Sequence, residues 1–373
     1  MILHLLTDEK FSDYVVEQFS AKEMCSDFIL VSDTLKMTYF HYIDKVRVIN
    51  YAHQRELNQL LNLISQYDAV IFHGLFEPWQ EWLLRQRPTD VKVAWCVWGG
   101  EIYSRPDLIN FFLSPITKVI ARYRQITHKV DNTPYMIPRD LFKEIDYCLT
   151  CVDEEYLYCK NLLKANFKHL WYTYYSLSEM IGSLMTSRCE GNNIWLGNSA
   201  TIENNHFDAL LKLKRVGIGN RKIIAPLSYG YPWARNACIR VGRFLFGNRF
   251  HPLADYLPRE EYNRMMLSCA VMIQAHLREQ AHGNIVTGLW LGMRVYLSEN
   301  GMEYNHFKRI GCKVYSIETD LKHDNPKVLE PLSKEDVAHN RKVLLSVYGL
   351  DHIDVMNREI VKELVEHEQI NGK

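Results

Sequence analysis

Short apolar runs separated by helical segments most constrain how this chain can fold. The first half holds the runs FILVS, VRVIN, DAVIFHG, VKVAWCVWG and DYCLTCV. These runs are continuously apolar, which is typical of strands that are buried on both faces of a parallel sheet. After a break rich in aromatic residues, Ser and Gly, similar runs recur between helical segments in the second half. The sequence therefore predicts an α/β protein with two Rossmann-like domains, a cleft between them and C-terminal helices.

The length of 373 residues also favours two domains over one. We expect a first Rossmann-like domain over residues 1–170 and a crossing segment over residues 171–192. A second Rossmann-like domain is expected over residues 193–340, followed by helices over residues 341–373 that pack back on the first domain. The last of these helices is predicted over about Ile353–Glu368.

Composition and charge exclude several classes of protein. Lys+Arg and Asp+Glu each total 44, so the net charge does not favour nucleic acid, and no arginine-rich run occurs. No apolar run approaches the roughly 18 residues of a membrane-spanning helix. The nine cysteines lie mostly in apolar contexts, which indicates a reduced, cytoplasmic chain. Cys148 and Cys151 have CxxC spacing without a second pair, so strand packing explains them better than zinc.

The stretch Ala270–Asn300 is predicted to form a strand, a polar loop, a helix and a second strand. Gly283 and Asn284 are placed in the loop, before a helix that starts at about Ile285. Such a turn leaves main-chain N–H groups free at the positive end of the helix dipole, where a phosphate binds. Ordinary α/β packing is the alternative. Polar residues crowd the same strand end, where open α/β sheets bind ligands: His276, Arg278, Glu279, Gln280 and His282.

Two further loops follow predicted strands of the second half. Gly197 permits close approach of the backbone, and Asn198 and Ser199 offer hydrogen bonds to a phosphate. A plain helix N-cap is an equally good interpretation of these residues. In the next loop, Tyr229 and Tyr231 are suited to stack on a base, although aromatic loops also cover cores. Three such loops at consecutive strand ends predict a nucleotide site.

His73 and Glu101 are the candidate general bases of the first half. His73 ends the run DAVIFH, and Glu101 follows the run VKVAWCVWGG. A histidine and a carboxylate on adjacent strand ends can remove a proton from a hydroxyl group. The structural alternatives are a loop hydrogen bond for His73 and a helix cap for Glu101.

The segment Arg105–Lys143 is locally basic, with seven Lys or Arg residues against three Asp residues. Apolar residues lie near helical spacing beside these cations: Phe111, Phe112, Ile116, Val119 and Ile120, with Lys118, Arg122, Arg124 and Lys129. This pattern predicts contact with an anionic membrane surface. An ordinary amphipathic surface helix is the alternative.

Several blocks of the sequence resemble the TDP-N-acetylfucosamine:lipid II N-acetylfucosaminyltransferase family, of the 4-α-L-fucosyltransferase type. They fall in order over about residues 68–308: FHGLFEPWQEW, WCVWGGEIY, IWLGNSATIENNHFDAL, the loop 226–232, and REEYNRMMLSCAVMIQAHLREQAHGNIVTGLWLGMRVYLSEN. That family adds 4-acetamido-4,6-dideoxygalactose to an undecaprenyl-diphosphate-linked disaccharide in enterobacterial common antigen synthesis. The two ends of this chain match the family poorly.

The resemblance implies a GT-B fold, in which the first domain binds the acceptor and the second binds the donor nucleotide. GT-B transferases need no bound metal, and this sequence has no D-x-D pair, so we expect no metal and no cofactor. Many of them carry an E-x7-E element. Here Glu279 fits its first carboxylate, but Thr287 stands in the place of the second. The family carries Asp at the position of Glu101.

The sequence therefore predicts a hexosyltransferase that is cytoplasmic and peripheral on the inner face of a bacterial cell membrane. It would move a deoxyamino sugar from a dTDP-sugar, or else a UDP-sugar, to a polyprenyl-diphosphate-linked saccharide in cell-surface polysaccharide synthesis. A GT-B-fold nucleotide-sugar epimerase and a non-catalytic nucleotide-sugar-binding subunit are the alternatives.

The predicted roles divide between the two halves. In the donor half, Asn198, Ser199, Gly283 and Asn284 hold the pyrophosphate, Tyr229 and Tyr231 flank the base, Glu279 contacts the sugar, and Arg278 offsets the charge of the leaving diphosphate. In the acceptor half, Glu101, with His73 as the alternate, activates the acceptor hydroxyl.

Overall fold

The computed structural model describes residues 1–34, 36–127, 135–325 and 327–365. Contacts between residues divide the chain into two compact units. The described residues of the first unit come from Met1–Arg105, Pro134–Tyr174 and Leu350–Lys373, and those of the second from Pro106–Thr133 and Tyr175–Gly349. Residues 366–368, the predicted end of the last helix, lie outside the described residues.

The first unit is built on a parallel sheet with the strand order β3-β2-β1-β4-β5-β6-β7. Its strands are β1 (Ile2–Leu6), β2 (Ser26–Ser32), β3 (Arg47–Asn50), β4 (Ala69–His73), β5 (Lys92–Cys96), β6 (Tyr147–Leu149) and β7 (Lys168–Leu170). Every residue of β1 and of β4 is buried, which explains why these segments are apolar apart from His4 and His73, whose rings are hydrogen bonded inside the unit.

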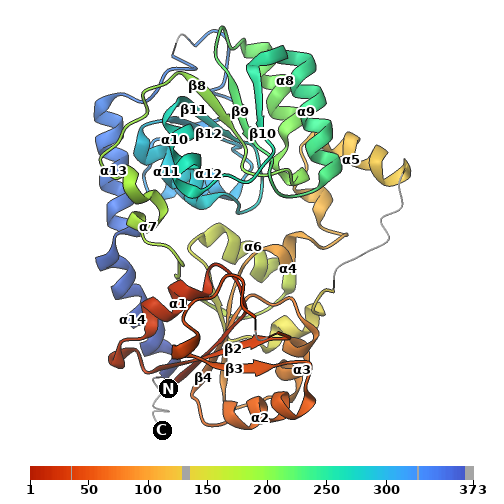
Figure 1. Cartoon of the computed structure of the whole chain (residues 1–373), viewed down its shortest axis with the longest axis vertical. Coiled ribbons are helices and arrows are strands. Elements are labelled where there is room, and N and C mark those ends of the chain that lie inside the picture. The colour runs from red at the N-terminus through yellow and green to blue at the C-terminus, as the bar shows by residue number, and fades with distance from the viewer. Residues whose placement is uncertain (35, 128–134, 326, 366–373) are drawn as a thin grey trace. The chain divides into compact units, whose positions relative to one another are not determined.

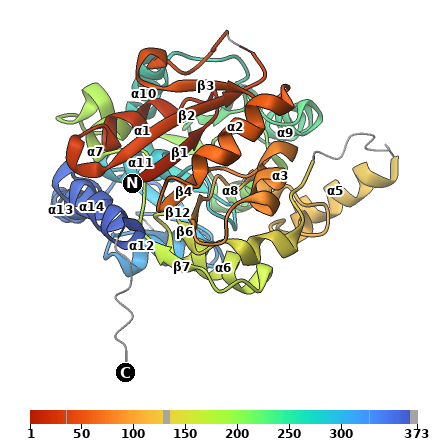
Figure 2. The same ribbon diagram turned by 90° about the horizontal axis from the view of Figure 1, so that it is seen from below.

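Helices cover both faces of this sheet. α1 (Ser12–Phe19) and α14 (Leu350–Val365) pack together on one face, and α2 (Gln54–Ile64) and α3 (Pro78–Gln86) lie side by side on the other (Figure 2). The other helical segments of this unit are η1 (Lys22–Met24), η2 (Ile43–Lys45), α4 (Gly100–Tyr103), η4 (Arg139–Glu144) and α6 (Asp153–Leu163).

The second unit has a parallel sheet with the order β10-β9-β8-β11-β12-β13. Its strands are β8 (Asn193–Leu196), β9 (Ile223–Pro226), β10 (Phe250–Leu253), β11 (Cys269–Gln274), β12 (Arg294–Leu297) and β13 (Tyr315–Ser316). The six residues of β11 are all buried. This central strand therefore has the same two-sided burial as β1.

Helices also cover this sheet on two faces (Figure 1). α8 (His206–Val216) and α9 (Pro232–Phe246) share a core cluster on one face, whereas α11 (His282–Leu291) packs with α7 (Leu177–Ile181) and α13 (Lys334–Tyr348) on the other. The other helical segments are η3 (Ile109–Phe111), α5 (Pro115–Thr127), η5 (Gly182–Leu184), η6 (Ile202–Asn204), η7 (Gly247–Arg249), α10 (Arg259–Leu267) and α12 (Met302–Arg309).

The division into units differs from the expected boundaries in two segments. α5 belongs to the second unit, although the expected first domain includes it. α13 also belongs to the second unit, whereas α14 packs against α1 and β1 of the first. The reason for the first difference is that apolar residues of α5 pack on α8, which lies far away in the sequence.

In each sheet the strand order reverses once, between β1 and β4 and between β8 and β11. Both sheets therefore have the doubly wound order of a Rossmann fold, in which ligands bind at the carboxyl ends of the strands beside the reversal. The predicted α/β class with two Rossmann-like halves and C-terminal helices is confirmed. The loops after β8 and β11, which carry the predicted donor residues, lie at the reversal of the second sheet.

The nine cysteines are free thiols. Cys148 lies inside β6 and is buried, in agreement with the strand-packing interpretation of its CxxC spacing with Cys151. Cys151 is half-buried, Cys25 is exposed, and the others are buried.

Candidate functional site

Asn198, in the loop after β8, connects three loops of the second unit. Its main-chain N–H donates to Asn204 Oδ1 (3.0 Å), and its Nδ2 donates to the Tyr229 hydroxyl (3.0 Å). Its Oδ1 accepts from Gln280 Nε2 (3.0 Å). The hydroxyl of Ser199 accepts from Asn204 Nδ2 (2.9 Å). The side chains of Asn198 and Ser199 are thus held by the protein itself, and they shape the loop at the end of β8.

The same loop requires a glycine at its start. Gly197 has a φ of +67°, and a Cβ there would lie 2.5 Å from His206 Nε2 and 2.9 Å from Asn204 Oδ1. α8 begins at His206, with Asn205 before it. The alternative interpretation of Asn198 and Ser199 as the N-cap of a helix is therefore wrong, because a 3-10 turn lies between them and α8.

Gln280 completes the link between the loops after β8 and β11. Besides Asn198, its Nε2 donates to Thr201 Oγ1 (3.2 Å). Sequence reasoning noted Gln280 as a polar residue at the strand end and gave it no role. Its partners are about eighty residues away in the chain (|i−j| of 79 and 82), so no local pattern indicated them.

Tyr229 and Tyr231 lie in the loop after β9 and are 59% and 41% exposed. Main-chain hydrogen bonds join this loop to the loop after β8, from Ala200 N to Tyr229 O (2.7 Å) and from Tyr231 N to Ala200 O (3.3 Å). The ring of Tyr231 stacks on Trp233 with centroids 6.5 Å apart. Two partly exposed rings on a loop fixed in this way suit stacking on a flat ligand.

α11 begins at His282, so Gly283 and Asn284 lie in its first turn and not in the loop before it. The prediction that this helix starts at about Ile285 is therefore wrong by one turn, because Ala281, with a φ of +61°, precedes the helix in place of a recognisable capping side chain. The Ile285 N–H donates back to Ala281 O (3.0 Å). The N–H groups of residues 282–284 precede it and have no acceptor within the helix.

Gly283 gives these amides an open approach. A Cβ at Gly283 would meet only Met180 within 4 Å, at 3.9 Å, so packing does not require a glycine at this position. The first turn holds no acidic residue. Asn284 Nδ2 donates to the Tyr262 hydroxyl (2.9 Å), which keeps this side chain at the side of the turn. The first turn of α11 is therefore suited to an anion.

Arg278 and Glu279 lie between β11 and α11. His276 Nδ1 donates to Arg278 O (3.1 Å), and Arg278 Nη1 donates to Glu279 O (2.8 Å). Burial lowers the pKa of His276 to about 3, so its ring is neutral. Local hydrogen bonds thus hold the loop, and the loop places the Arg278 guanidinium next to the N-terminus of α11.

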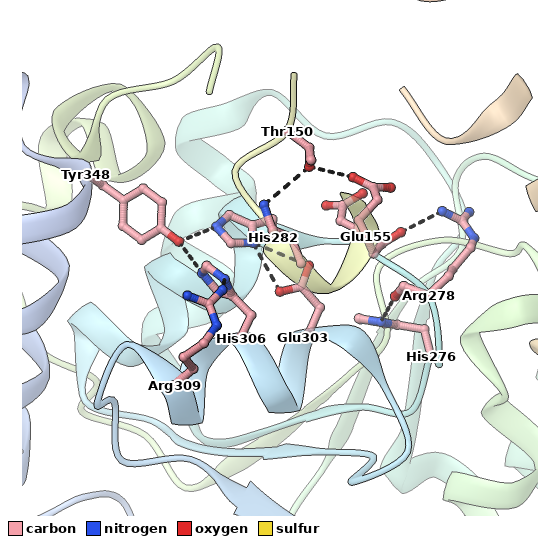
Figure 3. Close-up of polar contacts among 11 residues, drawn as sticks. Thr150, Glu155, His276, Arg278, His282, Glu303, His306, Arg309 and Tyr348 are labelled. Carbon is pink, nitrogen blue, oxygen red and sulfur yellow. Dashed lines mark hydrogen bonds and ion pairs between the residues drawn. The ribbon is translucent and has the colours of Figure 1, made fainter. Parts of the chain in front are cut away.

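A polar cluster lies beside the N-terminus of α11, and we call it the His282 cluster: Glu279, His282, Glu303, His306 and Tyr348. Figure 3 shows four of its members, His282, Glu303, His306 and Tyr348. His282 Nδ1 lies 3.1 Å from Glu303 Oε2, and the Tyr348 hydroxyl lies 2.8 Å from His282 Nε2 and 2.7 Å from His306 Nε2. Sequence reasoning missed Glu303, His306 and Tyr348. The available signal was the i,i+3 spacing of Glu303 and His306, which places both on one face of α12.

Three members of this cluster could also hold a metal ion. The ligand atoms of Glu279, His282 and Glu303 all lie within 4.8 Å of one another, which makes them a candidate group within the described part of the chain. Two carboxylates and one imidazole form a donor set that divalent transition metals accept. The sequence predicted no metal.

Glu101, in α4 of the first unit, is 2% exposed. Its Oε1 accepts from Trp95 Nε1 (3.0 Å) and from the Trp98 main-chain N–H (3.0 Å). Its Oε2 is buried and has no hydrogen-bond partner of ordinary geometry in the described residues. Burial raises the pKa of Glu101 to about 7, against the opposing effect of the main-chain and Trp N–H groups. A carboxylate with one free oxygen and this pKa is suited to general base catalysis.

His73 has both ring nitrogens in hydrogen bonds. Its Nδ1 lies 2.9 Å from the Tyr174 hydroxyl, and its Nε2 lies 3.1 Å from His4 Nδ1. His4 continues the chain to the hydroxyl of Ser26 (3.2 Å). Burial, with the neighbouring His4, lowers the pKa of His73 well below its usual value. The geometry therefore favours Glu101 over His73 as the group that has a free acceptor atom.

α5 carries the predicted basic surface, of which Lys129 lies outside the described residues. Part of its apolar set packs inside the second unit, against Ile202 and Phe207: Ile116, Ile120 and Ala121. Three other large apolar residues of this region are 67–70% exposed: Phe111, Val119 and Tyr123. Within the described ranges, no helix is long and apolar enough to cross a bilayer.

Solved structures with the same architecture are glycosyltransferases of the GT-B fold. A glycosyltransferase from Rickettsia africae superposes with a TM-score of 0.64 at 12% identity, over 98% of each chain. WaaG, a glycosyltransferase involved in lipopolysaccharide biosynthesis, has a TM-score of 0.56 at 10% identity, over 98% of this chain and 100% of its own. AviGT4, a glycosyltransferase involved in avilamycin A biosynthesis, has a TM-score of 0.56 at 10% identity, over 98% of each chain.

No protein-family model matches the sequence, and no curated protein matches it. The structural likenesses at identities of 10–12% establish the GT-B fold, as the sequence resemblance implied. The activity must be argued from the residues of this chain.

The raised pKa of Glu101 predicts a pH-dependent stability difference. The folded chain holds this proton up to about pH 7, whereas an ordinary glutamate loses it at 4.5. The parent must therefore lose stability as the pH rises between these values, by up to about 3 kcal/mol. Glu101→Gln removes this loss, so its free energy of unfolding should rise relative to the parent between about pH 5 and pH 8 in urea titrations.

Glu335→Gln is the control for this comparison. Glu335 is exposed, and hydrogen bonds from its own main chain and from Ser333 lower its pKa from 4.5, so its substitution should change the relative stability only below about this pH and leave it constant between about pH 5 and pH 8. A difference between parent and Glu101→Gln that stays constant with pH would contradict the assigned environment of Glu101.

Proposed function

We propose that this protein is a glycosyltransferase that takes a sugar from a nucleotide-sugar donor. The observation that carries the proposal is the open first turn of α11, which lies beside the strand reversal in the second sheet of a GT-B fold. A diphosphate needs hydrogen-bond donors and positive charge, and this turn offers both.

The donor binds to the second unit in this proposal. The N–H groups of Gly283 and Asn284 hold the diphosphate, and Arg278 offsets its charge as it leaves. Tyr229 and Tyr231 flank the base, and Glu279 contacts the sugar. Asn198 and Ser199, predicted as direct ligands, contribute by fixing the loop that faces the ligand, since their side chains already have protein partners.

The acceptor hydroxyl binds to the first unit and is deprotonated by Glu101. Oε1 is held by two N–H groups, so the carboxylate has one orientation, and Oε2 is left to receive the proton. His73 supports this loop from behind, because Tyr174 accepts from Trp98 Nε1 (2.6 Å) and also bonds to His73. No step of the proposal requires a metal.

The finer proposal follows the sequence resemblance. The donor is a dTDP-sugar, or else a UDP-sugar, that carries a deoxyamino sugar, and the acceptor is a polyprenyl-diphosphate-linked saccharide. A lipid-linked acceptor requires the protein to work at a membrane surface. The exposed apolar residues Phe111, Val119 and Tyr123, next to Lys118 and Arg122, support such a contact.

Gly283→Ala tests the diphosphate site. A methyl group at this position meets almost no protein atom, and alanine is the better helix former, so the variant should be as stable as the parent or more stable by about 0.5–1 kcal/mol. The methyl group obstructs the approach to the amides, so calorimetric titration with dTDP and UDP should show affinity lower by about tenfold or more. Asn284→Asp should lower the affinity too, through charge repulsion.

Failure of the parent to bind either nucleotide would end the donor-site proposal. Unchanged affinity in both variants would place the diphosphate elsewhere on the protein.

Glu101→Gln tests the catalytic role. The variant should bind the donor nucleotide like the parent, but its kcat for transfer to a polyprenyl-diphosphate saccharide should fall by about a hundredfold or more. The kcat of the parent should fall as the pH drops below about 7, where Glu101 becomes protonated. Product analysis over a panel of dTDP- and UDP-sugars measures both effects, and undiminished transfer by the variant would refute the assignment.

Tyr123→Ser tests the membrane contact. Removal of this exposed ring should reduce co-sedimentation with anionic phospholipid vesicles at low salt, and added salt should reduce it further. Tyr256→Ser is the matched control, because Tyr256 is an exposed tyrosine (83%) on another part of the second unit. Equal sedimentation of both variants and the parent would leave α5 as an ordinary surface helix.

A further inference from the structure

The outer helices of the second unit carry a positive charge that the balanced composition of the whole chain conceals. Lys+Arg and Asp+Glu each total 44, yet no Asp or Glu occurs between Asp208 and Asp255. Most of α8 and all of α9 lie in this interval. A long run of one sign in a neutral chain indicates a surface for a partner of the opposite sign. The interval holds nine cations: Lys212, Lys214, Arg215, Arg221, Lys222, Arg235, Arg240, Arg243 and Arg249.

α9 turns one stripe of side chains to the core and another to solvent. Its buried residues recur along one side of the helix: Ala234, Cys238, Gly242 and Phe246. Gly242 brings this side close to β10, because a Cβ there would lie 2.5 Å from the ring of Phe250. A second set has the spacing i, i+4, i+7 and i+8, which places its members on a common face. These residues are exposed, and we call them the α9 stripe: Asn236, Arg240, Arg243 and Phe244.

The α9 stripe combines an uncovered aromatic ring with unpaired cations. Phe244 is 88% exposed, the largest fraction among the large apolar side chains that the structure describes. Arg240 and Arg243 are exposed, and neither forms an ion pair within the described ranges. Water around a phenyl ring is unfavourable, so an exposed ring of this size is stabilised by an apolar partner. The partner that suits the α9 stripe is therefore apolar at one depth and anionic at another.

The cations continue from the α9 stripe to the end of α8. Lys214, in the last turn of α8, donates from Nζ to the main-chain oxygen of Leu245, 3.3 Å away. Leu245 is the residue after Phe244, so this hydrogen bond holds a further cation at the same end of α9. Arg221 lies outside this group in its electrostatics, because it forms an ion pair with Glu330 (2.9 Å).

α5 joins the same basic layer of the second unit. α8 packs against both α5 and α9 (Figure 1), and Arg124 of α5 lies 5.9 Å from the ring centroid of Trp233 in the first turn of α9. The three helices contain one carboxylate, Asp208. Its oxygens accept from the main-chain N–H groups of Ile116 (3.0 Å) and Thr117 (2.8 Å). Asp208 is thus bound at the start of α5, and no other carboxylate of these helices balances the exposed cations.

An anionic bilayer fits this surface better than a nucleic acid does. Proteins that bind single-stranded nucleic acid combine a basic groove with several rings on which successive bases stack. The α9 stripe instead presents one ring between arginines on the outer side of a helix. This is the arrangement of an interfacial helix, whose cations meet lipid phosphates while its apolar side chain enters the boundary of the acyl chains.

We propose that the α9 stripe is a second membrane-binding surface, at which Phe244 enters the headgroup boundary of an anionic bilayer and Arg240 and Arg243 contact lipid phosphates. The proposal rests on the proposed function in one respect, that the protein works at a membrane surface. It is independent of the donor site at α11. Because α9 and α11 belong to the same unit, the unit that binds the donor would itself be held at the membrane.

Co-sedimentation with vesicles of phosphatidylcholine, alone or with about 30% phosphatidylglycerol, tests this proposal. The parent should bind only the anionic vesicles, and added salt should weaken the binding. Arg240→Gln and Arg243→Gln should each lower the partition coefficient about fivefold, and Phe244→Ser should lower it about tenfold. The three sites are exposed, so the variants should keep the melting temperature of the parent.

Arg264→Gln is the matched control for the arginine variants. Arg264 is an exposed arginine of α10, whose Asn263 donates to the main-chain oxygen of Ile181 in α7 (3.4 Å), on the other face of the second sheet. The control changes the net charge by the same amount, and it should bind vesicles like the parent. An equal loss in Arg264→Gln would show that net charge alone drives the binding, and it would overturn the proposal.

Two comparisons separate this surface from the other proposals. The α9 variants should bind dTDP and UDP with the affinity of the parent in calorimetric titrations, whatever their binding to vesicles. If Tyr123→Ser loses vesicle binding and the α9 variants do not, the contact at α5 stands and the α9 proposal fails. Tighter binding of the parent to single-stranded RNA than to vesicles, lost in the same three variants, would also overturn it.

Discussion

Burial of parallel strands on both faces is the constraint on which both units depend. A strand such as β1 or β11 has no solvent-facing side, so its side chains are apolar or internally hydrogen bonded. Polar groups that act on a ligand must then lie in the loops at the carboxyl ends of the strands. The second unit places Asn198, Gln280 and Arg278 in such loops, and the first places Glu101 after β5. The two-sided burial therefore restricts the functional residues of both units to these loops.

Much of this architecture could be predicted from the sequence, because apolar runs and glycine-containing turns are local signals. The strands around the two reversals and the amide-rich start of α11 follow from such signals. The first residue of α11 could not be predicted from a local signal. Ala281 precedes the helix in a left-handed conformation, at a position where a Ser, Thr or Asp would have indicated the boundary. The partners of Asn198 could not be predicted either. They come from loops that are distant in the sequence, and their hydrogen bonds change its role from a direct ligand to a support of the loop.

The hydrogen bonds of the His282 cluster also join residues that are distant in the sequence, so they could not be predicted from it. Tyr348 lies 66 residues after His282, at the end of α13, and only the packing of α13 on α11 brings them together. Tyr348 is fully buried, and no local pattern in the sequence predicts which polar group its hydroxyl meets.

Two carboxyl groups with raised pKa values, the buried Glu101 and the half-buried Glu279, differ in what surrounds them. Glu101 is held by N–H groups of Trp95 and Trp98, which favour the ionised form, so burial is the opposing effect. Glu279 has a second carboxyl group as its neighbour, which favours the protonated form. The raised pKa of Glu279 therefore has a second cause besides burial, a neighbouring negative charge, which Glu101 lacks.

The distribution of the thiols has a practical consequence for spectroscopy. Burial raises the pKa of Cys238, Cys269 and Cys312 to about 12, and it also raises the pKa of Cys96 and Cys148, so these sulfurs are poor nucleophiles in the folded chain. Cys25, exposed after η1 in the first unit, is the thiol that a maleimide reagent reaches most easily. A fluorophore should therefore attach to Cys25 before it reaches the half-buried Cys151 or the buried cysteines.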